Sequence, residues 1–168
     1  ERLDQPLLLS LAAELPAARI VLAGRVKPGV DVSRLQAAPG IHLLGYVPYE
    51  QLPGVLREAD VCLVPYEVNE LTRSCNPLKV FEYLATGRPV VATALDGLEW
   101  CEDVVAIAGD RAAFRAAVRE ALADPERGRR ARLERARANG WEARVDELEG
   151  ILREARTLHE ERAARRAA

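Results

Sequence analysis

Short apolar runs that alternate with helical patterns constrain this chain more than any other feature. The runs are continuously apolar instead of alternating apolar with polar residues, and they cover residues 19–24, 41–45, 61–65, 89–93 and, more weakly, 103–107. Continuous apolar strands are typical of a parallel sheet that is covered on both faces. Parallel neighbours need crossover connections of about a dozen residues or more, which helices supply. The sequence therefore predicts a doubly wound parallel α/β fold.

The regions between and after these runs show helical spacing of apolar residues. We expect helices at residues 6–14, 52–59, 76–86, 111–123, 126–138 and 141–164. After residue 124 the composition changes to Arg, Ala and Glu, which divides the chain into an α/β domain (1–124) and C-terminal helices (125–168). The chain begins without Met, and its first predicted element is a helix. We therefore expect a fragment whose missing part lies upstream.

The composition excludes several classes of function. The 168 residues carry a net charge of −2, so we expect no nucleic-acid partner. The basic run at 127–132 is interleaved with Glu nearby and is interpreted as a solvated helix face. No apolar run reaches the roughly 20 residues of a transmembrane helix. The three cysteines have no metal-ligand spacing, and with the absence of a signal peptide they indicate a reducing, cytoplasmic location.

The helix predicted at residues 76–86 carries the strongest chemical signal. Asn76 suits the N-cap position and Pro77 the first helical position. The amides of Leu78 and Lys79 would then be unpaired at the positive end of the helix dipole, which favours an anion such as a diphosphate. Glu82 lies about one turn further on and could accept hydrogen bonds from the hydroxyls of a ribose. The alternative is a solvent-exposed Lys79–Glu82 pair that stabilises the helix by a few tenths of a kcal/mol.

Two loops at the predicted carboxyl edge of the sheet support a ligand site. A long polar connection precedes the helix, and we expect three of its residues to contact phosphate oxygens: Thr72, Arg73 and Ser74. Gly45 ends another strand at the same edge, where the lack of a side chain allows a ligand to approach the backbone.

Three stretches in this order make the chain recognisable: 40–53 (GIHLLGYVPYEQLP), 59–66 (ADVCLVPY) and 76–93 (NPLKVFEYLATGRPVVAT). Together they resemble the C-terminal, Rossmann-like domain of GT-B fold glycosyltransferases. The closest group is the large retaining family that contains many bacterial cell-envelope and exopolysaccharide enzymes. The resemblance covers residues 7–152, and it implies that a first strand and an N-terminal acceptor domain precede residue 1.

The resemblance also implies roles for individual residues. Glu82 matches the second glutamate of the family's paired-glutamate signature, which holds the donor ribose. The start of the predicted helix matches the segment that faces the donor diphosphate, which here consists of Asn76, Pro77, Leu78 and Lys79. The turn after the second predicted strand matches the segment that contacts the base, which here consists of Gly45, Tyr46 and Val47. The first glutamate of the signature falls at Ser74, which is not acidic, so its contact with the sugar is not transferred. Arg25 and Lys27 could replace basic residues that the family places after its first strand.

These features predict a glycosyltransferase of the hexosyltransferase type, with this chain as the half that binds a nucleotide-sugar donor. The resemblance implies retention of configuration and no metal, since helix amides and basic side chains neutralise the leaving diphosphate. No catalytic residue is assigned in this chain, and the isolated fragment is expected to be inactive. The last helix is expected to pack on the N-terminal domain or to mediate weak self-association, and the whole protein could be peripheral to the membrane. The alternatives are a sugar-nucleotide epimerase of the same fold and a non-catalytic regulatory or scaffold module.

Overall fold

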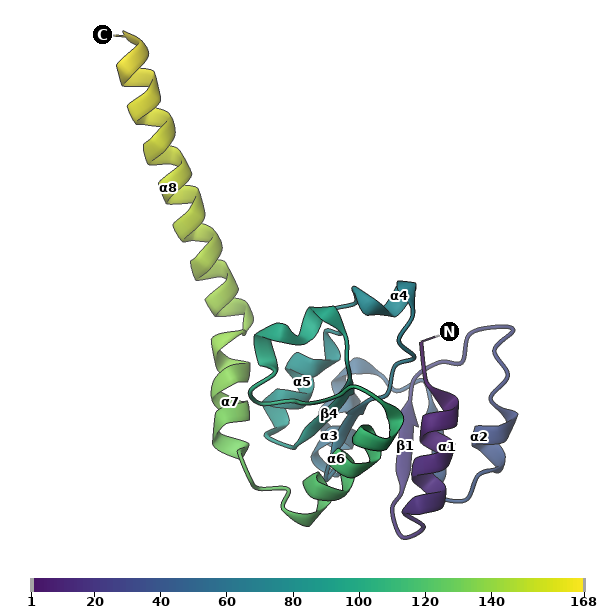
Figure 1. Cartoon of the computed structure of the whole chain (residues 1–168). Helices are drawn as coiled ribbons and strands as arrows, with labels where there is room; N and C mark the ends of the chain where they lie inside the picture. The colour runs from purple at the N-terminus through teal and green to yellow at the C-terminus, as the bar shows by residue number, and fades with distance from the viewer. Residues whose placement is uncertain (1, 168) are drawn as a thin grey trace.

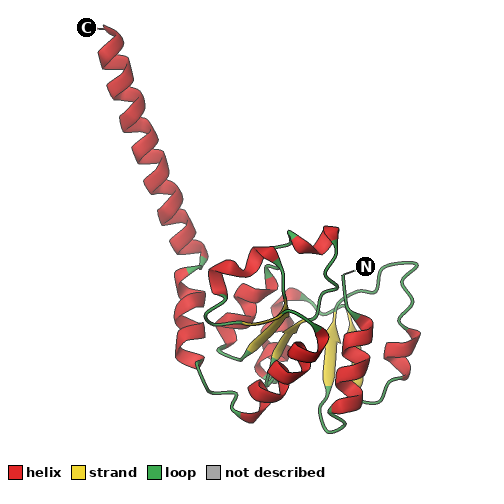
Figure 2. Ribbon diagram, in the orientation of Figure 1, coloured by secondary structure: helices red, strands yellow, loops and turns green. Residues whose placement is uncertain are grey.

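The computed structural model describes residues 2–167, and it describes the side-chain surroundings of residues 2–159. Helices and strands alternate along most of the described chain, and two helices follow at its end (Figures 1 and 2). The elements are α1 (Gln5–Glu14), β1 (Ile20–Ala23), α2 (Ser33–Ala37), β2 (Ile41–Gly45), the 3-10 helix η1 (Tyr49–Gln51), α3 (Leu52–Arg57), β3 (Cys62–Val64), α4 (Glu70–Arg73), α5 (Lys79–Thr86), β4 (Val90–Thr93), the 3-10 segment η2 (Asp96–Cys101), β5 (Ala106–Ala108), α6 (Arg111–Ala123), α7 (Arg129–Ala138) and α8 (Trp141–Ala167).

The strands form two parallel groups. β1 pairs with β2, while β3, β4 and β5 pair in that order, and each of these pairings is parallel. The prediction of a parallel α/β fold is therefore confirmed. Within the described residues, however, the strands form a two-stranded and a three-stranded sheet instead of one continuous sheet.

One apolar cluster holds the two sheets together. α1 contributes Leu7, Leu8 and Leu11, which pack in the same cluster as Ile20 of β1 and Val91 of β4. α6 also joins this cluster, so α1 and α6 cover the same side of the strands (Figure 1). Burial of these aliphatic side chains contributes on the order of 2 kcal/mol each. The two parts of the sheet are therefore joined by helix packing and not by backbone pairing.

A second apolar cluster covers the other side of the three-stranded sheet. Val80 and Leu84 of α5 pack in it with Val64 of β3 and Val90 of β4. This confirms the apolar face predicted for α5. Helices on both sides of the strands explain why their sequences are continuously apolar.

Three elements begin three residues later than predicted. α5 begins at Lys79 instead of residue 76. The last strand begins at Ala106 instead of residue 103, because the amides of Val104 and Val105 both donate to the carbonyl of Cys101 in a turn. The helix predicted from residue 126 begins at Arg129, after Gly128 with φ 72°.

The interpretation of the basic run 127–132 as a solvated helix face is wrong for Arg132, which lies in α7. Arg132 is only 6% exposed, and its guanidinium donates hydrogen bonds to three carbonyl oxygens, those of Gly87 (2.9 Å), Arg127 (2.7 Å) and Pro125 (3.1 Å). Gly87 ends α5, where carbonyl groups lack helical partners and a cation is favourable. Arg132 therefore fastens α7 to α5 and is not part of a solvated face.

α8 leaves the body of the molecule and extends away from it (Figure 1). Its large apolar side chains within the described residues are exposed: Trp141 (88%), Val145, Leu148, Ile151, Leu152 and Leu158. None of the described helices is long and apolar enough to cross a membrane.

Candidate functional site

The start of α5 presents free backbone amides. The amides of Val80 and Phe81 donate to the carbonyls of Pro77 (2.9 Å) and Leu78 (3.1 Å). Within the described part of the chain, the amides of Leu78 and Lys79 have no protein acceptor. Amides at the start of a helix lie at the positive end of its dipole and favour an anion. This is the arrangement that the sequence predicts for a diphosphate.

The predicted N-cap at Asn76 is wrong. Leu78 occupies the N-cap position with helical backbone angles, and no side chain caps the helix. Asn76 is exposed and Pro77 is buried, so Pro77 anchors the connection before the helix. No capping side chain therefore competes with a ligand for the amides at the start of α5.

Lys79 does not form the surface pair with Glu82 that was the alternative interpretation. Its ammonium nitrogen lies 5.0 Å from the centroid of the Tyr66 ring, a cation–π distance. Tyr66 follows β3 and is 7% exposed, and its amide donates to the hydroxyl of Thr93 at the end of β4 (3.2 Å). Lys79 is therefore held at the carboxyl edge of the three-stranded sheet. The sequence pattern does not by itself indicate a role for Tyr66, although an aromatic residue just after a buried strand is a signal for one.

Glu82 lies on the next turn of α5 and is half-buried. Its charge contributes to the raised pKa of the neighbouring Tyr83 phenol, after the larger effects of burial, Cys62 and Tyr66. A half-buried carboxylate beside free amides and a fixed ammonium group can accept hydrogen bonds from vicinal hydroxyls.

The connection before α5 is ordered by its own hydrogen bonds. Asn69 and Thr72 form a capping box around α4, in which each side chain accepts a hydrogen bond from the other's amide, both at 3.0 Å. The Thr72 hydroxyl also donates to the carbonyl of Glu67, and the residue is fully buried. The structure therefore argues against the predicted contact between Thr72 and a phosphate, because the Thr72 hydroxyl is buried and bonds to the backbone of Glu67 and Asn69 in the connection before α5. Arg73 and Ser74 are exposed and remain available.

The predicted base-binding turn lies at the end of the other sheet. Gly45 has φ 69°, which favours glycine, and its carbonyl accepts a hydrogen bond from the amide of Gly24 (2.8 Å). Tyr46 is 62% exposed, and the guanidinium carbon of Arg25 lies 4.3 Å from the centroid of its ring. Val47 is half-buried. The structure thus brings Lys79 and Tyr66 together and places Glu82 about one turn further along α5, while Gly45–Val47 lie at the end of β2.

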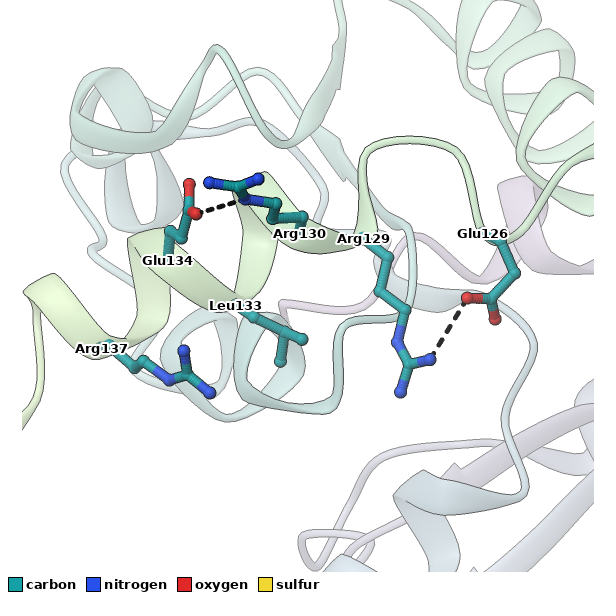
Figure 3. A pocket seen from close by; sticks show the side chains of 6 residues that line it. All are labelled: Glu126, Arg129, Arg130, Leu133, Glu134 and Arg137. Carbon is teal, nitrogen blue, oxygen red and sulfur yellow. Dashed lines mark hydrogen bonds and ion pairs between the residues drawn. The ribbon is translucent and has the colours of Figure 1, made fainter.

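Two recesses lie on the surface of the described chain. One lies on α7, where Arg130 pairs with Glu134 (2.7 Å) and Arg129 with Glu126 (3.3 Å), so that these two arginines already have carboxylate partners (Figure 3). The other, of about 650 Å³, lies at the carboxyl ends of β3, β4 and β5. Its lining includes Tyr66, Glu67, Thr93, Asp110 and Arg111. It adjoins the Lys79 contact through Tyr66, and it extends the polar edge at which α5 begins.

A parallel α/β domain with free helix amides and a fixed lysine at the carboxyl edge of its sheet belongs to the class of open α/β folds that bind their ligands at this edge. The family described as glycosyl transferases group 1 matches residues 5–124, which is more than half of the chain. This chain therefore belongs to that glycosyltransferase family. The resemblance identified from the sequence is confirmed, and membership of this family argues against the epimerase and the non-catalytic module.

Two individual proteins illustrate the relationship. The chain is 29% identical over 96 residues to TuaH of Bacillus subtilis strain 168, assigned as a teichuronic acid biosynthesis glycosyltransferase; the match covers 56% of this chain and 24% of TuaH. The structure resembles sucrose-phosphate synthase from Thermosynechococcus elongatus with a TM-score of 0.73 and 23% identity, over 90% of this chain and 42% of that one. The chain thus spans less than half of the length of either relative.

Proposed function

We propose that this chain binds the nucleoside diphosphate of a sugar donor, and that the protein to which it belongs transfers the sugar, a hexose, to an acceptor with retention. The observation that carries this proposal is the start of α5, where the amides of Leu78 and Lys79 are free and the Lys79 ammonium is fixed on Tyr66. Family membership supports the same reading.

The start of α5 supplies what a departing diphosphate needs. When the bond between the anomeric carbon and the phosphate oxygen breaks, its electron pair stays on that oxygen and negative charge grows on the diphosphate. Free amides and a fixed ammonium group stabilise this charge without having to reorganise. Exposed Arg73 and Ser74 precede the helix and can add hydrogen bonds to phosphate oxygens. We therefore propose that donor binding needs no metal.

The other donor contacts follow from the sheet edge. Glu82 would accept hydrogen bonds from the ribose hydroxyls, because it lies one turn beyond the amides that face the phosphates. The base would meet the backbone of Gly45 and Val47 and the exposed ring of Tyr46. Arg25 lies against that ring and is suited to add positive charge on the same side.

The rest of the protein would supply the acceptor side. Both relatives are much longer than this chain, which supports the expectation of an N-terminal acceptor domain. The exposed apolar side chains of α8 would pack on that domain, with weak self-association as the alternative for the isolated chain. We expect the protein to work in the cytoplasm.

The experiment that tests this function is a calorimetric titration of the chain with UDP, GDP, ADP and TDP. We expect one diphosphate to bind saturably, and we expect Glu82→Ala and Lys79→Ala to abolish binding. Glu58→Ala and Arg34→Ala remove exposed charges elsewhere and serve as matched controls that should bind normally. Repeating the titration with EDTA tests the metal-free proposal. If wild-type protein binds none of the four, donor binding by this chain is refuted.

A further inference from the structure

The segment η2 lies against the connection that leads into α5. It follows β4, and Leu98 and Cys101 anchor it in the apolar core, where both are fully buried. Trp100 of η2 stacks on Phe81 of α5, with ring centroids 4.3 Å apart and an angle of 9° between the ring planes. η2 is therefore packed directly on the helix whose start forms the proposed diphosphate site.

Gly97 is the point of closest approach. A β-carbon at this position would lie 2.9 Å from the carbonyl oxygen of Cys75, 2.9 Å from the α-carbon of Asn76 and 3.1 Å from its β-carbon. Such contacts are shorter than carbon atoms tolerate, and two of the three atoms belong to the backbone, which cannot turn away like a flexible side chain. The φ of Gly97 is −87°, which any residue can adopt. Glycine is therefore required here for close packing and not for its backbone conformation.

The far side of η2 is held in place. Arg135 of α7 donates hydrogen bonds to the carbonyl of Trp100 and to the carboxylate of Asp103, the latter at 2.7 Å. With Leu98 and Cys101 buried on the inner side, η2 has little freedom to move outward. A β-carbon at position 97 would thus displace the Cys75–Asn76 backbone, which lies two to four residues before Leu78 and Lys79.

We propose that Gly97 is a positioning residue for donor binding: its missing side chain lets η2 set the position of the Leu78 and Lys79 amides. This inference rests on the proposed function, because it assumes that these amides face the diphosphate. Gly97 lies outside the donor site and would affect only the contacts with the diphosphate. The contacts with the nucleoside, at Glu82 and at Gly45–Val47, would stay unchanged.

The test compares each protein's affinity for the nucleoside diphosphate that binds wild type with its affinity for the parent nucleoside. In wild type the diphosphate should bind more tightly. In Gly97→Ala we expect this preference to fall by about tenfold or more, the effect of losing one or two hydrogen bonds to a charged group. The affinity for the nucleoside should stay the same. Gly54→Ala is the matched control, since nothing lies within 4 Å of a β-carbon at that position.

The outcomes are distinct. A preference that is unchanged in Gly97→Ala, or an equal loss of affinity for diphosphate and nucleoside, would overturn the role of Gly97 while leaving donor binding intact. A wild-type chain that binds no diphosphate would overturn the proposed function and this role with it. If Gly97→Ala does not fold, the double variant Asn76→Gly/Gly97→Ala removes one of the three contacts and relaxes the backbone there. The double variant should prefer the diphosphate over the nucleoside less than wild type does, but it should keep part of that preference. A preference equal to that of wild type would again refute the role.

Discussion

The ammonium nitrogen of Lys79 lies 5.0 Å from the centroid of the Tyr66 ring, which ties the first residue of α5 to the residue that follows the β3 edge. Lysine side chains at helix starts ordinarily extend into solvent with several rotamers. The contact with a buried aromatic ring restricts Lys79 and places its charge at the carboxyl edge of the sheet, where α5 begins. Tyr66 is therefore expected to contribute to anion binding without touching the anion.

Replacing Tyr66 tests this contact. Tyr66→Leu removes the aromatic face and should weaken diphosphate binding several-fold, in line with a cation–π energy of about 0.5–2 kcal/mol. Tyr66→Phe keeps the ring and should bind like wild type. Titration calorimetry of the two variants makes the comparison, and equal losses in both would show that the ring face is not what matters.

The Thr72 hydroxyl should stabilise the loop before α5. Thr72→Val keeps the shape of the side chain but leaves the Asn69 amide and the Glu67 carbonyl without their partner. Because Thr72 is fully buried, we expect a loss of about 1–3 kcal/mol in the local stability of α4. Hydrogen exchange of the Thr72 and Arg73 amides measures it. Thr72→Ser retains the hydroxyl and should keep most of the protection; equal exchange in both variants would contradict the argument.

Arg132 should be important for stability, in contrast to its neighbours. Burial lowers the pKa of its guanidinium, and three carbonyl oxygens accept its hydrogen bonds. Arg132→Met leaves these carbonyls unpaired, and we expect the free energy of unfolding to fall by about 2–4 kcal/mol. Arg132→Lys should restore little of this stability, because a single ammonium group cannot donate to three carbonyl oxygens in the way that the planar guanidinium group does.

Urea denaturation measures both variants, with Arg130→Met as the control. The Arg130 side chain is 91% exposed in an ion pair with Glu134, so its replacement should leave stability unchanged. A similar loss for Arg130→Met and Arg132→Met would indicate a general effect of removing positive charge from α7.

Cys62 should make the fold sensitive to alkali. Burial raises the pKa of its thiol from 9.0 to about 11, an effect that a hydrogen bond with Thr86 and the charge of Arg88 only partly oppose. Between these pH values the unfolded chain releases the thiol proton while the folded chain keeps it. Stability from this thiol is therefore complete below about pH 9 and is lost progressively up to about pH 11.

Thermal melting between pH 8 and 11 tests this expectation. Other groups also titrate in this range, so the informative quantity is the difference between wild type and Cys62→Ala. We expect the melting temperature of wild type to fall more steeply with pH than that of the variant. Parallel curves would mean that Cys62 does not contribute to the pH dependence.

Much of the fold could be predicted from local sequence. The bounds of α6 agree with the prediction because Asp110 caps its first turn by accepting from the Ala113 amide (2.8 Å), a contact within four residues. The start of α5 was placed too early because Asn76 and Pro77 carry local signals for a helix start. In the structure the backbone there lies against Gly97, about twenty residues further along the chain, and such a contact leaves no trace in the local pattern.

The sequence by itself determined the parallel α/β class and the family, and it predicts α5 as the site helix, because these depend on apolar periodicity and on residue types at short spacing. Tertiary structure decided that Lys79 lies on Tyr66 instead of pairing with Glu82, that Thr72 holds a loop, and that Arg132 is buried inside a basic run. It also decided that the strands form two sheets joined by α1 and α6. Each of these depends on which distant segments pack together, and packing depends on three-dimensional complementarity that no local spacing encodes.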